Sequence, residues 1–596
     1  MARAPKRRRS APEAAVSASG TAGPAALGAA SGGVGRGPPR RALVVSLAIG
    51  AVLGTGLSAL NVVLTFTVGT GFGGAIVVVL AGGAVLRLVR LLSWPALFVA
   101  YATASGGSLA VAGLDAAVGA ALLRGGEPSW PALAGLALLA NLAGIGAGLL
   151  LAPSVVSDAS LRYPALWPVI DLMRTLTRPG GGEAAGDGGQ RVLLVAAAAG
   201  ALVAAAATLT GHDSVRLGPG LPSYVAVSLS PMLFGLGLRI SGAAAVWVAG
   251  GAGYSVLTWG LSASSGGGEG YVEHLGSPYV VAVGAGLLLG YGVGFVVRER
   301  GCGGARSRLL GAGRRGAYEK GVERRVTGEG SASKALAVAA VAGGYGAVVV
   351  VLGVVLRDVP AGLFVAAGLP AMTLLFALLL NRVNAAIGLA PVAVLQYLAI
   401  VVLALLRVPA PVGYAVAGLV CCVSLASAYF VEAAKVAHHA PPGETPPRRV
   451  LLSCQAFGSA VGALAGVGLL YAVARSGAAG TAVLPAPVAT AIAFLDDLLR
   501  GSARQAASAG AYLAAAGGLG AVLSWWPAAM PTMLGLGILL PPATSSAVVA
   551  GGVVRRLLRG RVVAGGGSLA ATAGSGLILG GGLASAVLLP LRALLP

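Results

Sequence analysis

Residues 410–433, APVGYAVAGLVCCVSLASAYFVEA, form an apolar run in which Glu432 is the one charged residue. About 20 predominantly apolar residues are enough for a helix to cross the hydrocarbon core of a membrane. The run therefore predicts a membrane-spanning helix, and it is the pattern that decides the fold.

Runs of the same kind recur along the chain and predict about sixteen spans in an all-α, polytopic membrane protein. The others lie at 42–64, 68–91, 93–123, 130–153, 191–211, 222–240, 241–262, 278–298, 335–357, 360–382, 386–406, 450–474, 505–525, 528–554 and 566–590.

The composition of the whole chain agrees with this interpretation. Of its 596 residues, 57% are hydrophobic and 10% are charged, and the mean hydropathy is +0.87. These values exclude a soluble enzyme with a lipophilic tail. The 96 glycines predict close helix packing, because small residues let helix backbones approach each other in lipid.

The charge distribution indicates topology rather than nucleic-acid binding. The 41 Lys and Arg residues exceed the 19 Asp and Glu residues, and they gather in 1–41, 298–334, 434–449 and 555–561, between apolar runs. Basic loops favour the cytoplasmic side of a membrane. The four cysteines support neither a disulfide framework nor a zinc site.

Four segments follow from this pattern. Residues 1–41 are predicted to be a disordered, basic, cytoplasmic tail, with an organellar transit peptide as the alternative. Residues 42–298 and 335–596 are predicted to be two transmembrane repeats, joined by a basic cytoplasmic loop at 299–334. We expect a multi-pass protein of the cell membrane with a cytoplasmic N-terminus.

Two further apolar stretches, 163–177 and 483–499, are short, begin with proline and carry acidic residues. They predict re-entrant or interfacial helices. The free N–H groups of such a helix favour an anion, such as a peptide or chelator carboxylate. Asp171, Asp496 and Asp497 lie one to three turns further along these helices and are further candidate substrate-binding residues. The alternative is that both helices lie in the interface plane with their acids in headgroup water.

An internal repeat is predicted from four collinear matches. They pair 281–294 with 571–584, 245–251 with 547–552, 163–178 with 484–500, and 114–130 with 431–447. The last match places Asp115 opposite Glu432. Repeated halves are typical of secondary transporters, whose substrate sites lie at the repeat interface near the bilayer midplane.

Buried ionisable residues supply the candidate proton-coupling groups. Asp115 lies within the predicted span 93–123, and Glu432 lies near the end of the span at 410–433. A charge inside a membrane normally faces a cavity or a partner, so both carboxylates are candidates for carrying a proton. The alternative is an ion pair of Glu432 with Lys435, one helical turn away.

Neutral polar residues within the spans are candidates for binding substrate amides, although such residues also bond neighbouring helices. Asn61 and Asn141 are the two selected; Asn381, Asn384, Gln396 and Gln455 belong to the same class. The chain has no GxxxxGK[ST] motif, which excludes ATP-driven transport by this chain alone. We expect no catalytic residues, no metal site, no cofactor and no nucleic-acid partner.

The chain resembles the oligopeptide transporter (OPT) family, including its metal-chelate (yellow-stripe-like) branch, from about 42 to 590. The resemblance rests on Tyr163 and Pro164 followed by Asp171, on the Lys435-led segment that continues through Pro446, Arg448, Arg449 and Gln455, and on LGILLPPATSSAVVAGGVVRR at 536–556. It implies proton-coupled transport of peptides or metal chelates, with Tyr163 and Lys435 as substrate-binding residues.

We therefore predict a secondary active transporter of short peptides or peptide-like metal chelates, driven by proton symport. The expected partners are this small-molecule substrate, protons and membrane lipid, and the sequence leaves homo-oligomerisation open. The alternative function is an intramembrane enzyme or a lipid-linked-substrate flippase, for which paired catalytic groups would be needed at one depth.

Overall fold

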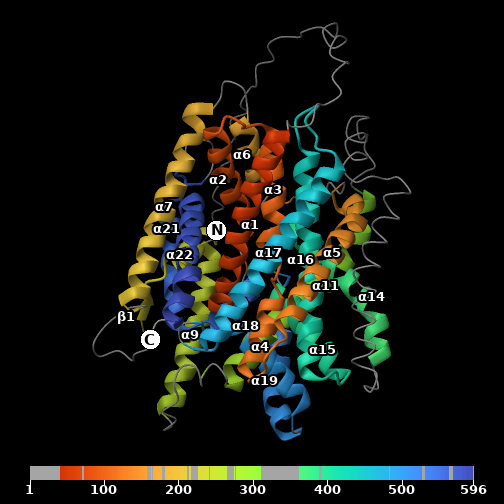
Figure 1. Cartoon of the computed structure of the whole chain (residues 1–596). Coiled ribbons are helices and arrows are strands. Elements are labelled where there is room, and N and C mark those ends of the chain that lie inside the picture. The colour runs from red at the N-terminus through yellow and green to blue at the C-terminus, as the bar shows by residue number, and fades with distance from the viewer. Residues whose placement is uncertain are drawn as a thin grey trace, which may run out of the picture. The chain divides into compact units, whose positions relative to one another are not determined.

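The computed structural model shows a bundle of helices (Figure 1). It describes residues 40–594 except for 70, 72, 157–162, 164–165, 178–181, 211–213, 217–225, 241, 265–273, 275–276, 310–361, 388–391, 482–483, 502, 526–529 and 563–567. Most of the predicted tail at 1–41, the predicted span at 335–357 and most of the loop at 299–334 lie outside the described residues.

The helices described in the first half of the chain include both long and short elements. They are α1 (Arg40–Val68), α2 (Ala75–Leu88), α3 (Trp94–Ser108), α4 (Leu114–Leu123), α5 (Trp130–Val156), α6 (Trp167–Thr177), α7 (Gly182–Thr210), α8 (Pro231–Arg239), α9 (Gly242–Ser264) and α11 (Pro278–Leu309). A small antiparallel hairpin of β1 (Ser214–Arg216) and β2 (Ala226–Ser228) interrupts this series.

The second half has a similar order of long and short helices. They are α14 (Gly362–Ile387), α15 (Val392–Leu405), α16 (Ala410–His438), α17 (Arg448–Ser476), α18 (Pro487–Arg500), α19 (Ala503–Leu523), α20 (Met530–Leu539), α21 (Pro542–Leu557) and α22 (Leu569–Leu594). The two Pro-led stretches are short helices, α6 and α18, as predicted.

The prediction of an all-α membrane protein is supported. Within the described residues, six helices are long and apolar enough to cross a membrane. They are Arg40–Thr67, Trp130–Pro153, Gly188–Thr210, Val365–Arg382, Ala410–His438 and Arg448–Ser476. Several other apolar helices are shorter, so the predicted count of sixteen is not established by helix length.

Four of the predicted spans are not single long helices in the structure. The runs at 68–91 and 386–406 form helices of only 14 residues, α2 and α15, about 21 Å long at 1.5 Å per residue. The run at 528–554 is divided into α20 and α21 at Pro541 and Pro542, because proline removes a backbone donor and clashes with the preceding turn. The run at 222–240 contains β2 followed by α8.

The predicted span at 93–123 is also broken, into α3 and α4. The chain unwinds at 109–113, where Gly113 has a φ of +94°, a conformation that favours glycine. A Cβ atom at this position would lie 2.6 Å from the Cβ of Cys421. The break therefore needs both the left-handed backbone and the small size of glycine, and it places irregular backbone inside the bundle.

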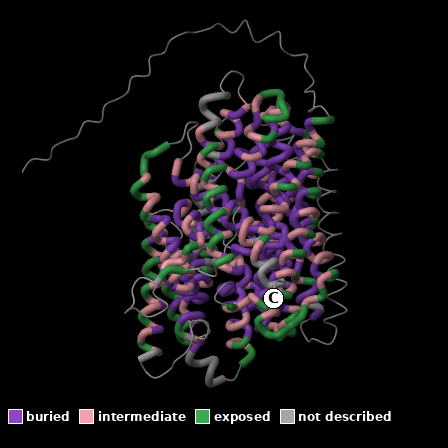
Figure 2. The backbone as a smooth tube through the Cα atoms, turned by 60° about the vertical axis from the view of Figure 1, so that its left-hand side comes forward, coloured by how far each residue is buried: buried purple, intermediate pink, exposed green. Residues whose placement is uncertain are grey.

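Close helix packing, predicted from the glycine content, is confirmed by glycine contacts. Helices α11 and α19 pack along each other, and a Cβ atom at Gly290 would clash with the backbone of Gly517. Helices α7 and α22 pack in the same way, with Gly580 against the backbone of Ala197. Buried positions gather between the helices, and exposed positions lie on their outward faces (Figure 2).

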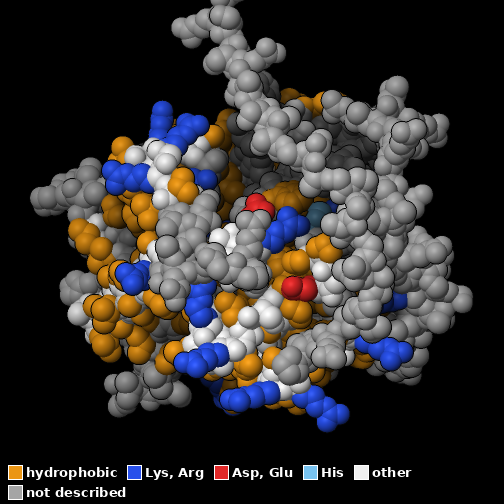
Figure 3. All heavy atoms as spheres, turned by 90° about the horizontal axis from the view of Figure 1, so that it is seen from above, with side chains coloured by type: hydrophobic (Ala, Val, Ile, Leu, Met, Phe, Trp, Pro, Cys, Tyr) orange, Lys and Arg blue, Asp and Glu red, His pale blue; other side chains and the backbone are white. Residues whose placement is uncertain are grey.

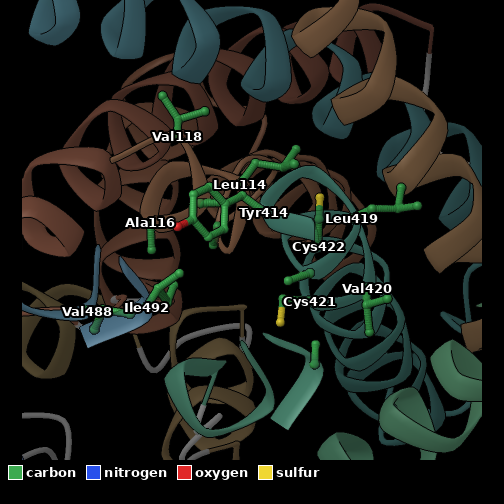
Figure 4. Packing of buried hydrophobic residues seen from close by; sticks show 14 of the residues in the cluster. Leu114, Ala116, Val118, Tyr414, Leu419, Val420, Cys421, Cys422, Val488 and Ile492 are labelled. Carbon is green, nitrogen blue, oxygen red and sulfur yellow. The ribbon is translucent and has the colours of Figure 1, made fainter. Parts of the chain in front are cut away.

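The core helix that positions the candidate site is α16. It packs against α5, α14, α4 and α15, and most of its residues from Gly413 to Ala437 are buried. Figure 4 shows Cys421 and Cys422 of α16 near Leu114 of α4, in a cluster that also includes Val488 of α18. The apolar run at 410–433 thus lies at the centre of one hydrophobic core.

Candidate functional site: two buried carboxylates

The break between α3 and α4 is stabilised by side-chain amides from three other helices. The side-chain amide of Asn61 donates a hydrogen bond to the Ser108 carbonyl at 2.6 Å, and that of Asn141 donates to the Ala110 carbonyl at 2.7 Å. The amide of Gln396 donates to the Gly113 carbonyl. Irregular backbone is tolerated inside a membrane protein only where its polar groups are satisfied. The predicted substrate-binding residues Asn61 and Asn141 therefore hold the backbone of the break in this structure.

Asp115 lies at the start of α4, directly after the break, and is only 1% exposed. Its Oδ1 accepts hydrogen bonds from the N–H of Gly113 at 2.9 Å and from the N–H of Ala116 at 2.8 Å. The side chain of Thr65 on α1 is a further neighbour of the carboxyl group. Asp115 thus anchors the beginning of α4, where a carboxylate also interacts favourably with the helix dipole.

Glu432 is the second buried carboxylate and has different neighbours. Its Oε1 accepts a hydrogen bond of 2.6 Å from Nδ2 of Asn384 on α14. The two tyrosines Tyr101 and Tyr429 are close enough to interact with it electrostatically. One side-chain amide thus bonds this carboxyl group, with two tyrosines in its vicinity, whereas backbone N–H groups hold Asp115.

Lys435 and Tyr163 come together near Glu432. The ammonium of Lys435 lies 5.4 Å from the ring centroid of Tyr163, close enough for a cation–π interaction. The same ammonium donates a hydrogen bond of 2.7 Å to the carbonyl of Val156, the last residue of α5. The structure therefore joins two of the predicted substrate-binding residues to each other, one helical turn beyond the predicted proton-coupling residue Glu432.

The other predicted binding residues lie elsewhere. Asp496 accepts hydrogen bonds from Arg124 at 2.8 Å and from Arg500 at 2.6 Å, and Tyr414 donates to it at 3.2 Å. Asp497 pairs with Arg124 as well. These residues form an ion-pair cluster that joins α18 to the end of α4 and to α16.

Asp171 is exposed on α6, so its side chain is not part of the buried carboxylate sites. Sequence reasoning selected Asp496 and Asp497 but missed Arg124 and Arg500. Arg500 lies four residues after Asp496, a spacing that places two side chains on one helix face and could have identified this pair.

The two histidines at the end of α16 contribute to packing. His438 is its last residue, and the ring of His439 lies 4.7 Å from the ring of Trp167. Arg174 donates a hydrogen bond of 2.9 Å to the carbonyl of His439. Burial, together with nearby Lys435, His438 and Arg174, lowers the pKa of His439 to about 4.

No group of three or more His, Cys, Asp or Glu side chains is placed to hold a metal ion within the described part of the chain. Basic side chains are more widely spread than acidic ones over the face of the molecule seen in Figure 3.

The two carboxylates are separated along α16. Cys422 of α16 lies near Asp115, close enough to interact electrostatically with it, and Glu432 follows ten residues later on the same continuous helix. At 1.5 Å per residue this spacing corresponds to about 15 Å along the helix axis. Asp115 and Glu432 therefore lie at two different heights and do not form the paired catalytic groups that an enzyme would need.

Comparison with known proteins gives one family match. Residues 317–591 match the family model described as OPT oligopeptide transporter protein. No curated protein matches the chain. The OPT family is a transporter family, so the match supports a role in transport rather than catalysis. The resemblance found in the sequence is thus confirmed for the second half of the chain, where residues 317–591 match the OPT oligopeptide transporter family model.

Proposed function

We propose that this protein is a secondary active transporter of short peptides or peptide-like metal chelates and that it works by proton symport. The family match to oligopeptide transporters supports the peptide substrate. The observation that carries the proposal further is a correspondence between the surroundings of Asp115 and those of Glu432.

The neighbours of the two carboxylates recur at nearly constant spacing along the chain. Thr65 is a neighbour of Asp115, as Asn384 is of Glu432. Asn384 follows Thr65 by 319 residues, and Glu432 follows Asp115 by 317. A second contact behaves in the same way. Asn61 donates to the Ser108 carbonyl at 2.6 Å, and Asn381 donates to the Ser427 hydroxyl at 3.0 Å. These paired contacts support the alignment of 42–298 with 335–596 as two transmembrane repeats.

The short helices α6 and α18 recur as well. Each is preceded by a residue with positive φ, Tyr163 at 46° and Ala486 at 49°. The N–H of Tyr163 donates to the Ala385 carbonyl at 2.8 Å, and the N–H of Ala486 donates to the Phe66 carbonyl at 2.7 Å. The approach to each short helix is thus bonded to the first helix that the structure describes in the opposite half, α14 for α6 and α1 for α18. Each half therefore bonds to a short helix of the other half. This arrangement favours a mechanism in which a movement of one half changes how far the carboxylate of the other half is shielded.

A two-site arrangement fits alternating access. Repeated halves that rock against each other expose a central site first to one side of the membrane and then to the other. We propose that Glu432 and Asp115 take up and release the coupled proton. Lys435 and Tyr163, beside Glu432, would bind an anionic group such as a peptide carboxylate or the carboxylate of a metal chelator, because an ammonium favours such a group.

The location of two segments relative to the membrane is proposed from their charge. The tail at 1–41 and the loop at 299–334 are cytoplasmic, since basic loops stay inside, and the protein spans the cell membrane. The other candidate substrate-binding residues are less central to this proposal. Four of them already have protein partners, and the fifth is exposed; they are Asn61, Asn141, Asp496 and Asp497, and Asp171.

Uptake into proteoliposomes tests this function. Labelled di- to hexapeptides are offered with and without an inward proton gradient, to wild type, to Glu432→Gln and to Glu444→Gln as a control. Glu444 is an exposed acid outside the site. We expect gradient-driven accumulation in the wild type and the control, and exchange without accumulation in Glu432→Gln. Accumulation that ignores the proton gradient would exclude symport.

A further inference from the structure

Helix α18 of the second half lies along α4 of the first half, the helix that begins at Asp115. The two helices pack against each other, and a Cβ atom at Gly119 of α4 would lie 2.8 Å from the Cβ of Ala489. Figure 4 shows Ile492 of α18 near Ala116, the residue after Asp115. Because Asp115 is only 1% exposed, α18 is one of the elements that shield its carboxyl group from water.

Ion pairs hold the C-terminal part of α18 against the end of α4. Arg124, the residue that follows α4, bonds to Asp496 at 2.8 Å and pairs with Asp497 as well. Its guanidinium also donates a hydrogen bond of 2.9 Å to the carbonyl of Ala493. We call Arg124, Asp496 and Asp497 the latch, since they join the two proposed repeats. The Arg124 side chain is 28% exposed, so it can separate from α18 into water without becoming a buried, unpaired cation.

The corresponding short helix of the first half, α6, is attached without an ion pair among the residues that the structure describes. Arg174 of α6 donates a hydrogen bond of 2.9 Å to the carbonyl of His439, directly after α16. The ring of Trp167 contacts the ring of the same histidine. Opening the latch separates opposite charges, whereas moving Arg174 away from a carbonyl leaves no anion behind. The two short helices therefore differ in which contacts must break before each can move.

We propose that the latch is a gate over Asp115, in which Arg124 holds α18 closed and releases it when the two repeats separate at this end. While the latch is closed, α18 seals the Asp115 carboxyl group from this side of the membrane. When Arg124 separates from Asp496 and Asp497, water reaches the carboxyl group. Alternating access requires a barrier at each end of a central site, and the barriers open in turn. This inference rests on the proposed function, in which Asp115 exchanges the coupled proton.

Two native cysteines distinguish a local opening from a general loss of packing. Cys421 of α16 is fully buried in the hydrophobic cluster that includes α18. Its Cβ would lie 2.6 Å from a Cβ atom at Gly113, two residues before Asp115. Cys454 of α17 is also buried, but its neighbour is Thr103 of α3. An open gate exposes Cys421 alone, whereas looser packing throughout the bundle exposes both cysteines.

Alkylation of the full-length protein in lipid nanodiscs tests the gate. The parent protein carries serine at Cys302 and Cys422, and mass spectrometry measures how fast N-ethylmaleimide labels the two remaining cysteines. Arg124→Gln removes the cation of the latch, Arg124→Lys retains it, and Asp497→Asn removes the more exposed of its two acids. The matched control is Arg475→Gln, because Arg475 is an exposed arginine in the last turn of α17, outside the latch.

Arg124→Gln should label Cys421 at least tenfold faster than the parent, a change that corresponds to about 1.4 kcal/mol in the opening equilibrium. Asp497→Asn should label it about two- to fivefold faster, as expected for an exposed ion pair. Arg124→Lys and Arg475→Gln should label Cys421 like the parent, and the rate at Cys454 should stay constant in every variant. Equal Cys421 rates in all variants, or faster labelling of both cysteines, would overturn the gate. If Arg124→Gln does not fold, an unchanged Cys421 rate in Asp497→Asn overturns it.

Peptide uptake into proteoliposomes separates a failure of the gate from a failure of the proposed function. Proton-driven uptake by the wild type, together with an unchanged Cys421 rate in Arg124→Gln, would refute the gate and leave transport intact. Faster labelling of Cys421 in Arg124→Gln, with no peptide uptake by the wild type, would refute peptide transport and retain the opening at α18.

Discussion

Asp115 and Glu432 are both buried, yet their hydrogen-bond partners lead to different expectations for substitution. Asp115 accepts from two backbone N–H groups through one oxygen, and that oxygen is present in asparagine as well. Asp115→Asn should therefore reach the membrane in normal amount, exchange substrate, and lose accumulation driven by pH. Counterflow and gradient-driven uptake in the same proteoliposomes measure the two activities. Wild-type accumulation by this variant at every pH would remove Asp115 from the proton path.

Asp115→Ala separates folding from coupling. Alanine removes the acceptor at the start of α4, a loss that costs about 1 kcal/mol for a typical N-terminal cap and up to about 2 kcal/mol. We expect a lower thermal midpoint in detergent for Asp115→Ala than for Asp115→Asn. Equal midpoints for both variants would show that Oδ1 does not hold the break.

His439 predicts a pH effect on stability. Its folded pKa is lowered to about 4 by burial and by Lys435, His438 and Arg174, whereas an unfolded histidine titrates near 6.5. Between about pH 6.5 and 4 the unfolded chain binds the proton and the folded chain does not, so stability falls as the pH falls. Thermal midpoints should therefore decrease less across this range for His439→Phe than for the wild type. A parallel decrease in both proteins would contradict this assignment.

Among the helices, α18 is fixed by a cluster of ion pairs. Asp496 has a side chain only 2% exposed and pairs with Arg124 and Arg500. Losing this carboxylate removes charged hydrogen bonds to two arginines that are themselves 28% and 29% exposed, so Asp496→Asn should destabilise the protein by about 1.5–3 kcal/mol. The control is Asp497→Asn, whose side chain is 72% exposed and should matter by less than about 1 kcal/mol. Thermal unfolding in detergent measures both, and equal effects would refute the difference in burial as the cause.

The break between α3 and α4 gives a second prediction for a structural element. Gly113 and Gly125 both have positive φ, but a Cβ atom would clash only at Gly113; at Gly125 nothing lies within 4 Å. Gly113→Ala and Gly125→Ala therefore share the conformational cost of about 1 kcal/mol and differ in packing. We expect a clearly lower thermal midpoint for Gly113→Ala. Similar midpoints would mean that the break tolerates a methyl group.

These helices also show what the sequence could and could not predict. Apolar length predicted long helices such as α16, and proline with short length predicted α6 and α18, because both signals are local. The break at 109–113 was not predicted, since the amides that satisfy it lie on other helices, at Asn61, Asn141 and Gln396. The same holds for the partners of Asp496, because Arg124 is distant in sequence.

For the whole molecule, the proposed repeat accounts for the long distances in sequence between residues that lie together. Tyr163 of the first half lies beside Lys435 of the second, and Ala486 of the second half bonds to Phe66 of the first. The residue that precedes each Pro-led helix thus bonds to a helix of the other half. We infer that both halves must fold together for transport, as an interface site in a repeat transporter requires.

Orientation in the membrane is the remaining property of the whole molecule. The basic loop at 299–334 separates the two proposed repeats, and basic loops of this size stay in the cytoplasm. Cysteines introduced singly between 310 and 330, after Cys302 is replaced by serine, should not react with an impermeant maleimide added to intact cells. They should react fully once the cells are permeabilised, which shows that the positions themselves are reactive. The loop at 263–277 carries Glu269 and Glu273 and no Lys or Arg, so we expect it on the outer side. A cysteine placed at Glu269 therefore supplies the opposite control and should react in intact cells. Labelling of the 310–330 cysteines from outside would reverse the orientation, and with it the side from which the proton gradient drives uptake.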